Sequence, residues 1–237
     1  MQNYLKILIL LTIVSCSPNW QYDSKNSSKK WGDINEKFKF CKIGLNQSPI
    51  DVVADFSVSD LSFHFQKNHQ QNNAEKERKD YVLKTVFFDQ SFLQRMKKKY
   101  FLRYFEFHHP SEHLVKNQAS SLEMQIAFKS EDEQWLMMSI FLEVGNHHKN
   151  FEEIISFVEN KKQKEGKIDL EKIIKKNDLV FFYEGSITTP PCTEGIKWYI
   201  YKTPIYISKE QMNIIIKNTI FTKTNARDVQ KFNPEKF

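Results

Sequence analysis

The stretch FLRYFEFHHPSEHLVKNQASSLEMQIAF, residues 101–128, predicts two β-strands joined by a short connection. Successive side chains of a strand point to opposite faces, so Glu106 and His108 share one face of the first strand. By the same alternation Glu123 and Gln125 share one face of the second strand. Polar side chains therefore line positions where the core of a sheet usually carries aliphatic ones, and they mark the candidate site.

The spacing of these polar residues also predicts a candidate metal site. Side chains at positions i and i+2 of a strand can converge on one ion, and Gln125 would approach from the neighbouring strand. Zinc takes three or four His, Cys or carboxylate ligands. Only Glu106 and His108 meet that requirement, because the amide of Gln125 is a poor zinc ligand. From this stretch alone we favour a hydrogen-bonded pocket without metal, and we expect His109 and His113 to pack or hydrogen-bond.

The composition predicts one large domain. The chain has 237 residues, of which 40% are hydrophobic and 27% charged, enough for a single sizeable core. Its 20 Phe, 9 Tyr and 4 Trp against 6 Gly favour a sheet-rich fold with an aromatic core. The net charge of +6 is mild and the lysines are scattered, so we expect no nucleic-acid partner.

The N-terminal segment, residues 1–17, predicts export. It carries one charge, Lys6, in a short apolar run followed by small residues, which is typical of a secretory signal and too short to span a bilayer. The same segment resembles a bacterial lipoprotein signal that would end at Ser15 and leave Cys16 to be lipidated. Both alternatives predict a secreted or extracytoplasmic protein without a transmembrane span. Membrane attachment would come only through a lipid on Cys16.

Export would leave two cysteines, Cys41 and Cys192, in a domain that we expect to span residues 31–237 after a polar arm at 18–30. An even pair in an oxidising compartment predicts one disulfide. Closing a loop of about 150 residues would stabilise the fold by at most roughly 4 to 5 kcal/mol in the chain-entropy model.

Hydrophobic periodicity predicts further strands and few helices, with turns over 31–51 and a surface loop over the polar run 67–79. Residues 135–144 form a nearly continuous apolar run, typical of a strand buried on both faces. The expected strands are 61–65, 81–88, 135–144, 179–183, 198–201 and 205–207, and the expected helices are 150–159 and one capped by Ser208 and Gln211 that runs to Lys217.

Several segments together resemble the α-class carbonic anhydrases. The matches cover nearly the whole expected domain in the order typical of that family, and the blocks QSPID and SITTPPC are specific. The resemblance implies a predominantly β (α+β) fold with a central, twisted, mostly antiparallel sheet and short peripheral helices. The matching segments are WGDIN at 31–35, Cys41 with QSPID at 47–51, FEFHHPSEH at 105–113, IFLEVG at 140–145, GSITTPPC at 185–192 with Trp198, and NAR at 225–227 with Gln230.

The resemblance also implies a metal site in an altered form. The family holds zinc with three histidines, and the metal lowers the pKa of bound water to about 7, which produces the hydroxide that attacks carbon dioxide. The aligned motifs put Glu106, His108 and Gln125 at the three ligand positions. Two of the three ligands have therefore changed.

Other family positions are retained. The resemblance assigns to Glu112 and Thr188 the orientation of the zinc hydroxide, which would make them the catalytic pair of an active enzyme. It places Thr189 and Trp198 in the pocket, and it gives Glu123 the role of supporting a ligand histidine.

We therefore favour a carbonic-anhydrase-related protein with little or no hydratase activity at neutral pH and no cofactor. In this hypothesis a hydrogen-bonded pair of Glu106 and protonated His108 fills the former metal cavity. The protein would act as a binding or structural module toward another protein or a cell-surface partner.

Two alternatives stay open. In the first, Glu106, His108, Gln125 and water still hold zinc, and the chain is an active or weakly active carbonic anhydrase with carbon dioxide and bicarbonate as its substrate and product. In the second, another divalent cation or another small substrate uses the same three residues. Metal analysis of the purified protein separates the three hypotheses.

Overall fold

The computed structural model describes residues 20–22, 27–64, 73–79, 82–87, 91–160, 162 and 165–232. The expected signal segment, the candidate lipidation site Cys16 and part of the expected polar arm lie outside the described residues.

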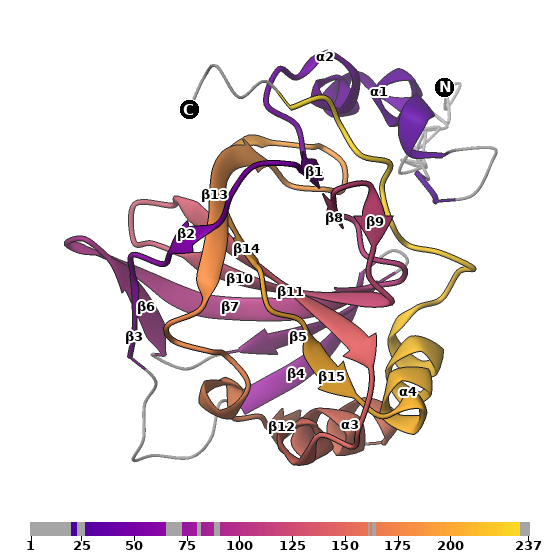
Figure 1. Cartoon of the computed structure of the whole chain (residues 1–237). Coiled ribbons are helices and arrows are strands. Elements are labelled where there is room, and N and C mark those ends of the chain that lie inside the picture. Colours follow the sequence, from indigo (N-terminus) through magenta and orange to yellow (C-terminus); the bar gives the residue numbers. More distant parts are fainter. Residues whose placement is uncertain are drawn as a thin grey trace, which may run out of the picture.

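The described residues form a twisted sheet of 12 strands (Figure 1). Its main path runs β12-β4-β5-β7-β10-β11-β14-β13-β2, while β6 joins β3 to β7 and β15 pairs with β11. Most neighbours are antiparallel, but β11 pairs in parallel with β14 and β15. The strands are β2 (Ser57–Val58), β3 (Leu61–His64), β4 (Asn73–Lys79), β5 (Val82–Phe87), β6 (Phe92–Arg95), β7 (Lys98–His108), β10 (Leu122–Lys129), β11 (Trp135–Val144), β12 (Glu165–Lys167), β13 (Leu179–Ser186), β14 (Glu194–Tyr201) and β15 (Ile205–Ile207).

Short elements surround this sheet. A small three-stranded sheet has the order β1-β8-β9, and β8 and β9 lie in the connection between β7 and β10. These strands are β1 (Asp51–Val52), β8 (Leu114–Val115) and β9 (Gln118–Ala119). The helices are α1 (Trp31–Ile34), α2 (Phe40–Ile43), α3 (Glu152–Glu159) and α4 (Lys209–Thr219), with 3-10 turns η1 (Ser28–Lys30), η2 (Glu36–Phe38), η3 (Lys149–Phe151) and η4 (Leu170–Lys172).

The two faces of the sheet have different coverings. Phe105 and Phe107 of β7 and Met124 of β10 join a buried cluster with Ile154 of α3 and Ile215 of α4. Figure 1 shows α3 and α4 on that side, and it shows α1, α2, the small sheet and the C-terminal segment on the opposite side. The polar face of β7 and β10 therefore points away from α3 and α4, toward α1, α2, the small sheet and the C-terminal segment.

Most strands predicted from periodicity are confirmed, including the β7–β10 pair and β11, which is buried from Leu136 to Leu142. The helix α4 begins with the predicted capping box, because Ser208 and Gln211 exchange side-chain and backbone hydrogen bonds.

Two predictions about irregular segments are wrong. Residues 73–79 of the expected surface loop form β4, which pairs with β5 from Ala74 to Lys79. The strand forms through backbone hydrogen bonds with β5. Its polar sequence has no hydrophobic period from which a strand could be predicted. Residues 31–51, expected to be turns, include the short helices α1 and α2, where Trp31 and Cys41 are buried.

The predicted disulfide between Cys41 and Cys192 is confirmed, with a Cα–Cα distance of 5.0 Å. Such a bond suggests an oxidising, extracytoplasmic location. Within the described parts of the chain, no helix is both long and apolar enough to cross a membrane.

Candidate functional site

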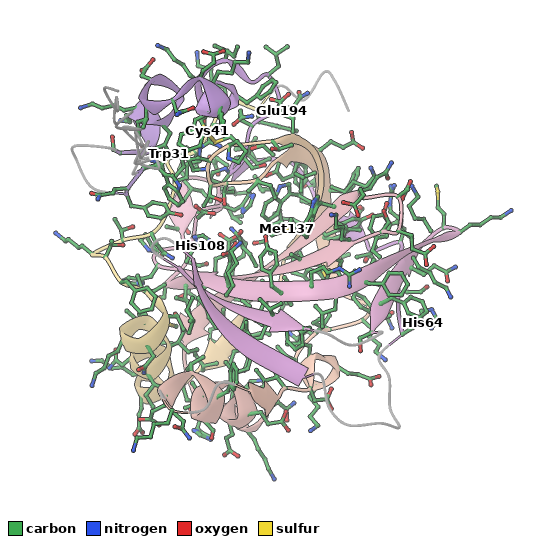
Figure 2. All side chains as sticks on the ribbon, turned by 180° about the vertical axis from the view of Figure 1, so that it is seen from behind. Trp31, Cys41, His64, His108, Met137 and Glu194 are labelled. Carbon is green, nitrogen blue, oxygen red and sulfur yellow. A yellow bond between two sulfur atoms is a disulfide. The ribbon has the colours of Figure 1, made fainter. Side chains whose placement is uncertain are left out.

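Two neighbouring strands bring the predicted polar residues together on one buried face. In the β7–β10 pairing Glu106 lies opposite Gln125, and His108 lies opposite Glu123. All four side chains are at most 4% exposed. Figure 2 shows His108 on the same side of the sheet as Met137 of the adjacent strand β11. Strand alternation and register are thus sufficient to assemble the site.

Glu123 is held by donors from the connection between the two strands. Its Oε2 accepts hydrogen bonds from the backbone N–H groups of Glu112 at 2.8 Å and His113 at 2.9 Å. Its Oε1 lies 2.8 Å from Nδ1 of His113. Burial acts to raise the pKa of Glu123, but the His113 ring and these hydrogen bonds lower it to about 2. Glu123 is therefore ionised at neutral pH.

The two histidines expected to have packing or hydrogen-bonding roles do form such contacts. His113 Nε2 lies 2.7 Å from the hydroxyl of Tyr183, which donates a hydrogen bond to Ser48 Oγ at 2.7 Å. His109 Nδ1 lies 2.8 Å from the carbonyl oxygen of Ser121. Both rings thereby hold the connection between β7 and β10 in place.

Gln125 links the two buried carboxylates. Its Nε2 donates to Glu112 Oε2 at 2.8 Å and to Glu123 Oε1 at 3.0 Å. The other oxygen of Glu112 accepts from the backbone N–H of Arg227 at 2.9 Å. Burial raises the pKa of Glu112, although His108 and a hydrogen bond with the Thr188 side chain oppose the shift. Thr188 therefore lies beside Glu112.

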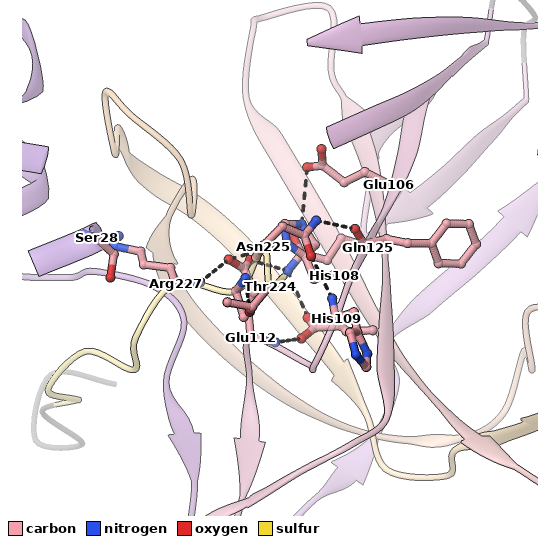
Figure 3. A network of polar contacts seen from close by, with 12 residues as sticks. Ser28, Glu106, His108, His109, Glu112, Gln125, Thr224, Asn225 and Arg227 are labelled. Carbon is pink, nitrogen blue, oxygen red and sulfur yellow. Dashed lines mark hydrogen bonds and ion pairs between the residues drawn. The ribbon is translucent and has the colours of Figure 1, made fainter. Parts of the chain in front are cut away.

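The C-terminal segment completes the site from the far end of the chain (Figure 3). The carbonyl oxygen of Asn225 lies 2.7 Å from Nδ1 of His108, and its side-chain amide donates to Phe107 O at 2.8 Å. The guanidinium of Arg227 donates to Ser48 O at 2.6 Å and to Cys41 O at 3.1 Å. These contacts join the site to the disulfide region.

A residue that sequence reasoning missed, Lys84 of β5, lies against Glu106. The Nζ atom of Lys84 is 3.3 Å from Glu106 Oε2 and 3.9 Å from the centroid of the Tyr104 ring. Burial acts to raise the pKa of Glu106, but Lys84 and His108 lower it to about 2. Burial acts to lower the pKa of Lys84, but Glu106 and Tyr104 shift it upward overall. Both groups are therefore charged at neutral pH.

The expected hydrogen bond between Glu106 and His108 is not present. Nε2 of His108 is 3.9 Å from Glu106 Oε1, the separation of an ion pair and too long for a hydrogen bond. The hydrogen-bond partner of the ring is instead Asn225, which fixes Nδ1. Burial acts to lower the pKa of His108, but Glu112, Glu106 and Asn225 raise it to about 9. The ring is protonated at neutral pH, as expected, and two carboxylates balance its charge.

Three buried polar atoms of this cluster make no hydrogen bond to any described residue. They are Glu106 Oε2, His108 Nε2 and Gln125 Oε1. They belong to the three residues that the alignment places at ligand positions. Buried polar atoms are nearly always paired, so this part of the site contrasts with the fully bonded carboxylates beside it.

An apolar wall adjoins the polar row. Ala127 of β10, Met137 of β11 and Trp198 of β14 occupy paired register positions and belong to one buried cluster. Trp198 is fully buried and donates from Nε1 to Ser186 O at 2.9 Å. Thr189, the other predicted pocket residue, is partly exposed. The wall therefore continues the face of the sheet that carries the polar cluster.

Comparison with known proteins identifies the family. The sequence matches the family model described as Eukaryotic-type carbonic anhydrase over residues 26–235. The chain belongs to the carbonic anhydrase family. A carbonic anhydrase from Nostoc sp. is 30% identical over 225 residues, which cover 91% of this chain and 83% of that protein.

Solved structures of the carbonic anhydrase fold agree with this assignment. The α-carbonic anhydrase from Thermovibrio ammonificans, in complex with the inhibitor sulfanilamide, has a TM-score of 0.80 and 28% identity, and the match covers 91% of this chain and 96% of that one. Dioscorin complexed with ascorbate has a TM-score of 0.78 and 25% identity, with 90% and 93% covered. The carbonic anhydrase scaffold is therefore present across nearly all of the chain.

Proposed function

We propose that this chain is an exported, carbonic-anhydrase-related protein with little or no hydratase activity, which acts as a binding or structural module. The observation that carries the proposal is the state of the three residues at the ligand positions. Glu106 is paired with the buried cation Lys84, and the amide nitrogen of Gln125 is committed to Glu112 and Glu123. His108 is the one imidazole left.

These residues do not fit the zinc ion that the family uses. When bound, zinc supplies an activated hydroxide, and it requires three or four strong donors. Gln125 offers a neutral amide oxygen, and Glu106 offers a carboxylate whose charge is already balanced by Lys84 at 3.3 Å. Loss of a residue that contacts a metal ligand, without binding the metal itself, commonly reduces metal affinity or activity by about 10- to 100-fold. Replacement of two of the ligands themselves should reduce metal affinity further.

The hydrogen bonds around the former ligand positions support a structural role for the polar cluster. Glu112 and Glu123 each accept hydrogen bonds on both oxygens from the chain itself. The charged groups thus balance one another without an external ion, and the scaffold can present its loops to a partner. One similar protein, dioscorin, has been captured with ascorbate, which supports binding of a small molecule as one form that such a module could take.

The second candidate is a retained metal site, and one observation favours it. Glu106 Oε2, His108 Nε2 and Gln125 Oε1 are buried without a hydrogen bond to any described residue, so an ion could in principle take all three. An active or weakly active zinc carbonic anhydrase, or a site for another divalent cation, would follow.

Metal content and hydration kinetics of the native protein separate the two candidates. The full chain is expressed with zinc in the medium and purified without chelator. Bound metals are then quantified by mass spectrometry, and carbon dioxide hydration is followed by stopped-flow with a pH indicator. We expect substoichiometric metal and a rate equal to the uncatalysed background, with a zinc-loaded carbonic anhydrase as the positive control. Stoichiometric zinc together with hydration would reject the proposal.

The proposal of export has a separate test. We expect the N-terminus of the mature protein to begin either after Ser17 or at a lipid-modified Cys16. Mass spectrometry of the mature chain from its natural host measures this directly, and a Cys16→Ala variant distinguishes the two forms by its release from membranes. An uncleaved chain that begins at Met1 and remains in the cytoplasm would contradict export.

A further inference from the structure

The position of Lys84 follows from the pairing of β5 with β7. Thr85 lies opposite Phe105 and Val86 lies opposite Tyr104 in this antiparallel ladder. Continuing the register by one residue puts Lys84 opposite Glu106, with both side chains on the face of the sheet that carries the site. Directly opposed side chains of opposite charge stabilise such a pair.

The surroundings of Lys84 hold its charge in place. Its side chain is 17% exposed and that of Glu106 is 5% exposed, so water screens the pair only weakly. The ammonium group is 3.3 Å from Glu106 Oε2, and it also lies over the Tyr104 ring at 3.9 Å from the centroid. A carboxylate and an aromatic face both favour a cation at this point.

A metal ion bound by the family positions would meet this ammonium group. Such an ion needs the carboxylate of Glu106 as a ligand, and the nitrogen of Lys84 already lies within ion-pair distance of that carboxylate. Two cations would then share one buried carboxylate, and their mutual repulsion is strong where the local dielectric is low. Replacing Glu106 by histidine would remove the carboxylate but leave the ammonium group beside the new ligand.

We infer that Lys84 excludes divalent metal from this site, so that three residues, and not two, separate the chain from a metal-binding carbonic anhydrase. This inference rests on the proposed function, since it explains how the cluster does without metal. In this role the ammonium group supplies the positive charge that Glu106 requires. Neither the family match nor the aligned motifs indicate that Lys84 discriminates against divalent metal.

The test compares zinc affinity in designed backgrounds. E106H/Q125H restores the family imidazoles but keeps Lys84, whereas K84M/E106H/Q125H also removes the charge with little change in side-chain length. We expect zinc to bind the triple variant about 10- to 100-fold more tightly than the double variant, the scale on which outer residues alter metal sites. Competition with a chromophoric chelator measures the affinity, and the absorption spectrum of bound Co²⁺ reports the coordination.

A matched control keeps the charge while changing the residue. K84R/E106H/Q125H alters the same three positions and should bind zinc as weakly as the double variant. Circular dichroism and thermal unfolding establish that each variant is folded. Equal zinc affinity in the double, Met and Arg variants would overturn the inference and leave the proposed function intact.

Single substitutions give an independent test in the otherwise native chain. K84M leaves Glu106 without its cation, so we expect affinity for Zn²⁺ to rise about 10-fold above that of the native protein, while K84R leaves it unchanged. No gain in K84M, measured on protein that is shown to be folded, would count against the inference. Stoichiometric zinc in the native protein would instead reject the proposed function, and the inference with it.

Discussion

The two halves of the polar cluster are built in different ways. In the hydrogen-bonded half, formed by Glu112, His113 and Glu123, every carboxylate oxygen accepts a hydrogen bond of 2.8 to 3.0 Å. In the charge-paired half, formed by Lys84, Glu106 and His108, the contacts between side chains are ion pairs at 3.3 and 3.9 Å.

The two halves depend on the sequence in different ways. Many donors of the hydrogen-bonded half are backbone N–H groups, such as those of Glu112, His113 and Arg227. They are present in any chain that adopts the fold. The charge-paired half depends on the identity of three side chains, so it can change without disturbing the scaffold.

The largest expected effect comes from the disulfide next to the hydrogen-bonded half, since Arg227 donates to Cys41 O and Gln47 donates to Cys192 O. The double variant C41S/C192S should lose at most about 4 to 5 kcal/mol of unfolding free energy, because the bond closes a long loop of the unfolded chain. Urea unfolding of the variant and of the native protein measures the loss. A loss below about 1 kcal/mol would show that the unfolded chain is not constrained in the way the entropy model assumes.

Within the site, removing the carboxylate of the hydrogen-bonded half should cost most. E123A leaves His113, Gln125 and two backbone N–H groups without their buried acceptor. We expect a loss of about 3 to 5 kcal/mol, the usual cost of breaking a buried charged pair. Urea unfolding compares it with E133A, which removes an exposed partner of Lys129 and should cost less than about 1 kcal/mol.

The corresponding change in the charge-paired half should cost less. E106A removes the ion-pair partner of Lys84, whose side chain is 17% exposed and keeps some contact with water. It breaks no hydrogen bond of ordinary geometry, so we expect a loss at or below the lower end of the cost of breaking a buried charged pair, about 3 kcal/mol or less. In the double variant K84M/E106A part of this loss should be recovered, since no uncompensated ammonium group remains. A double-mutant cycle from urea unfolding measures the coupling. An E106A variant less stable than E123A would reverse the comparison of the two halves.

A dependence of stability on pH also separates the two halves. Glu123 and Glu106 have pKa values lowered to about 2, so their stabilisation is present above the ordinary carboxyl pKa and is lost as the pH falls toward 2. The pKa of His108 is raised to about 9, so its stabilisation is complete below the ordinary histidine pKa and is lost as the pH rises through about 9.

Stability between pH 6.5 and 9 should therefore report on the charge-paired half. Unfolding free energies in urea should fall across this range in the native protein and should stay flatter in H108Q. The exposed His147 provides the control variant H147Q, which should follow the native protein. Identical profiles for native protein and H108Q would show that His108 does not gain its proton on folding.

Much of the fold could be predicted from periodicity because the central strands alternate or are wholly apolar. β7, β10 and β11 are of this kind. β4 could not be predicted in this way, since its sequence NAEKERK has no apolar period and the strand exists through backbone pairing with β5. Helices of four residues, such as α1 and α2, are too short for a helical period to be visible.

The candidate site shows the same division. The positions of Glu106, His108 and Gln125 follow from alternation and motif alignment, and the register confirms that they are adjacent. Lys84 could not be found this way, because its contact with Glu106 depends on the register of β5 against β7, which no local pattern fixes. The one available signal was a lysine in the mostly apolar sequence VLKTVF of β5.

The contact between Glu112 and Arg227 has a consequence for the timing of folding. The two residues are 115 positions apart, and Arg227 follows every strand of the sheet. On a ribosome, or in a channel that the chain enters from its N-terminus, all the strands emerge before Arg227, whose backbone N–H donates to Glu112. Until that residue emerges, Oε1 of Glu112 lacks its backbone donor, so this contact can form only after every strand of the sheet has been synthesised.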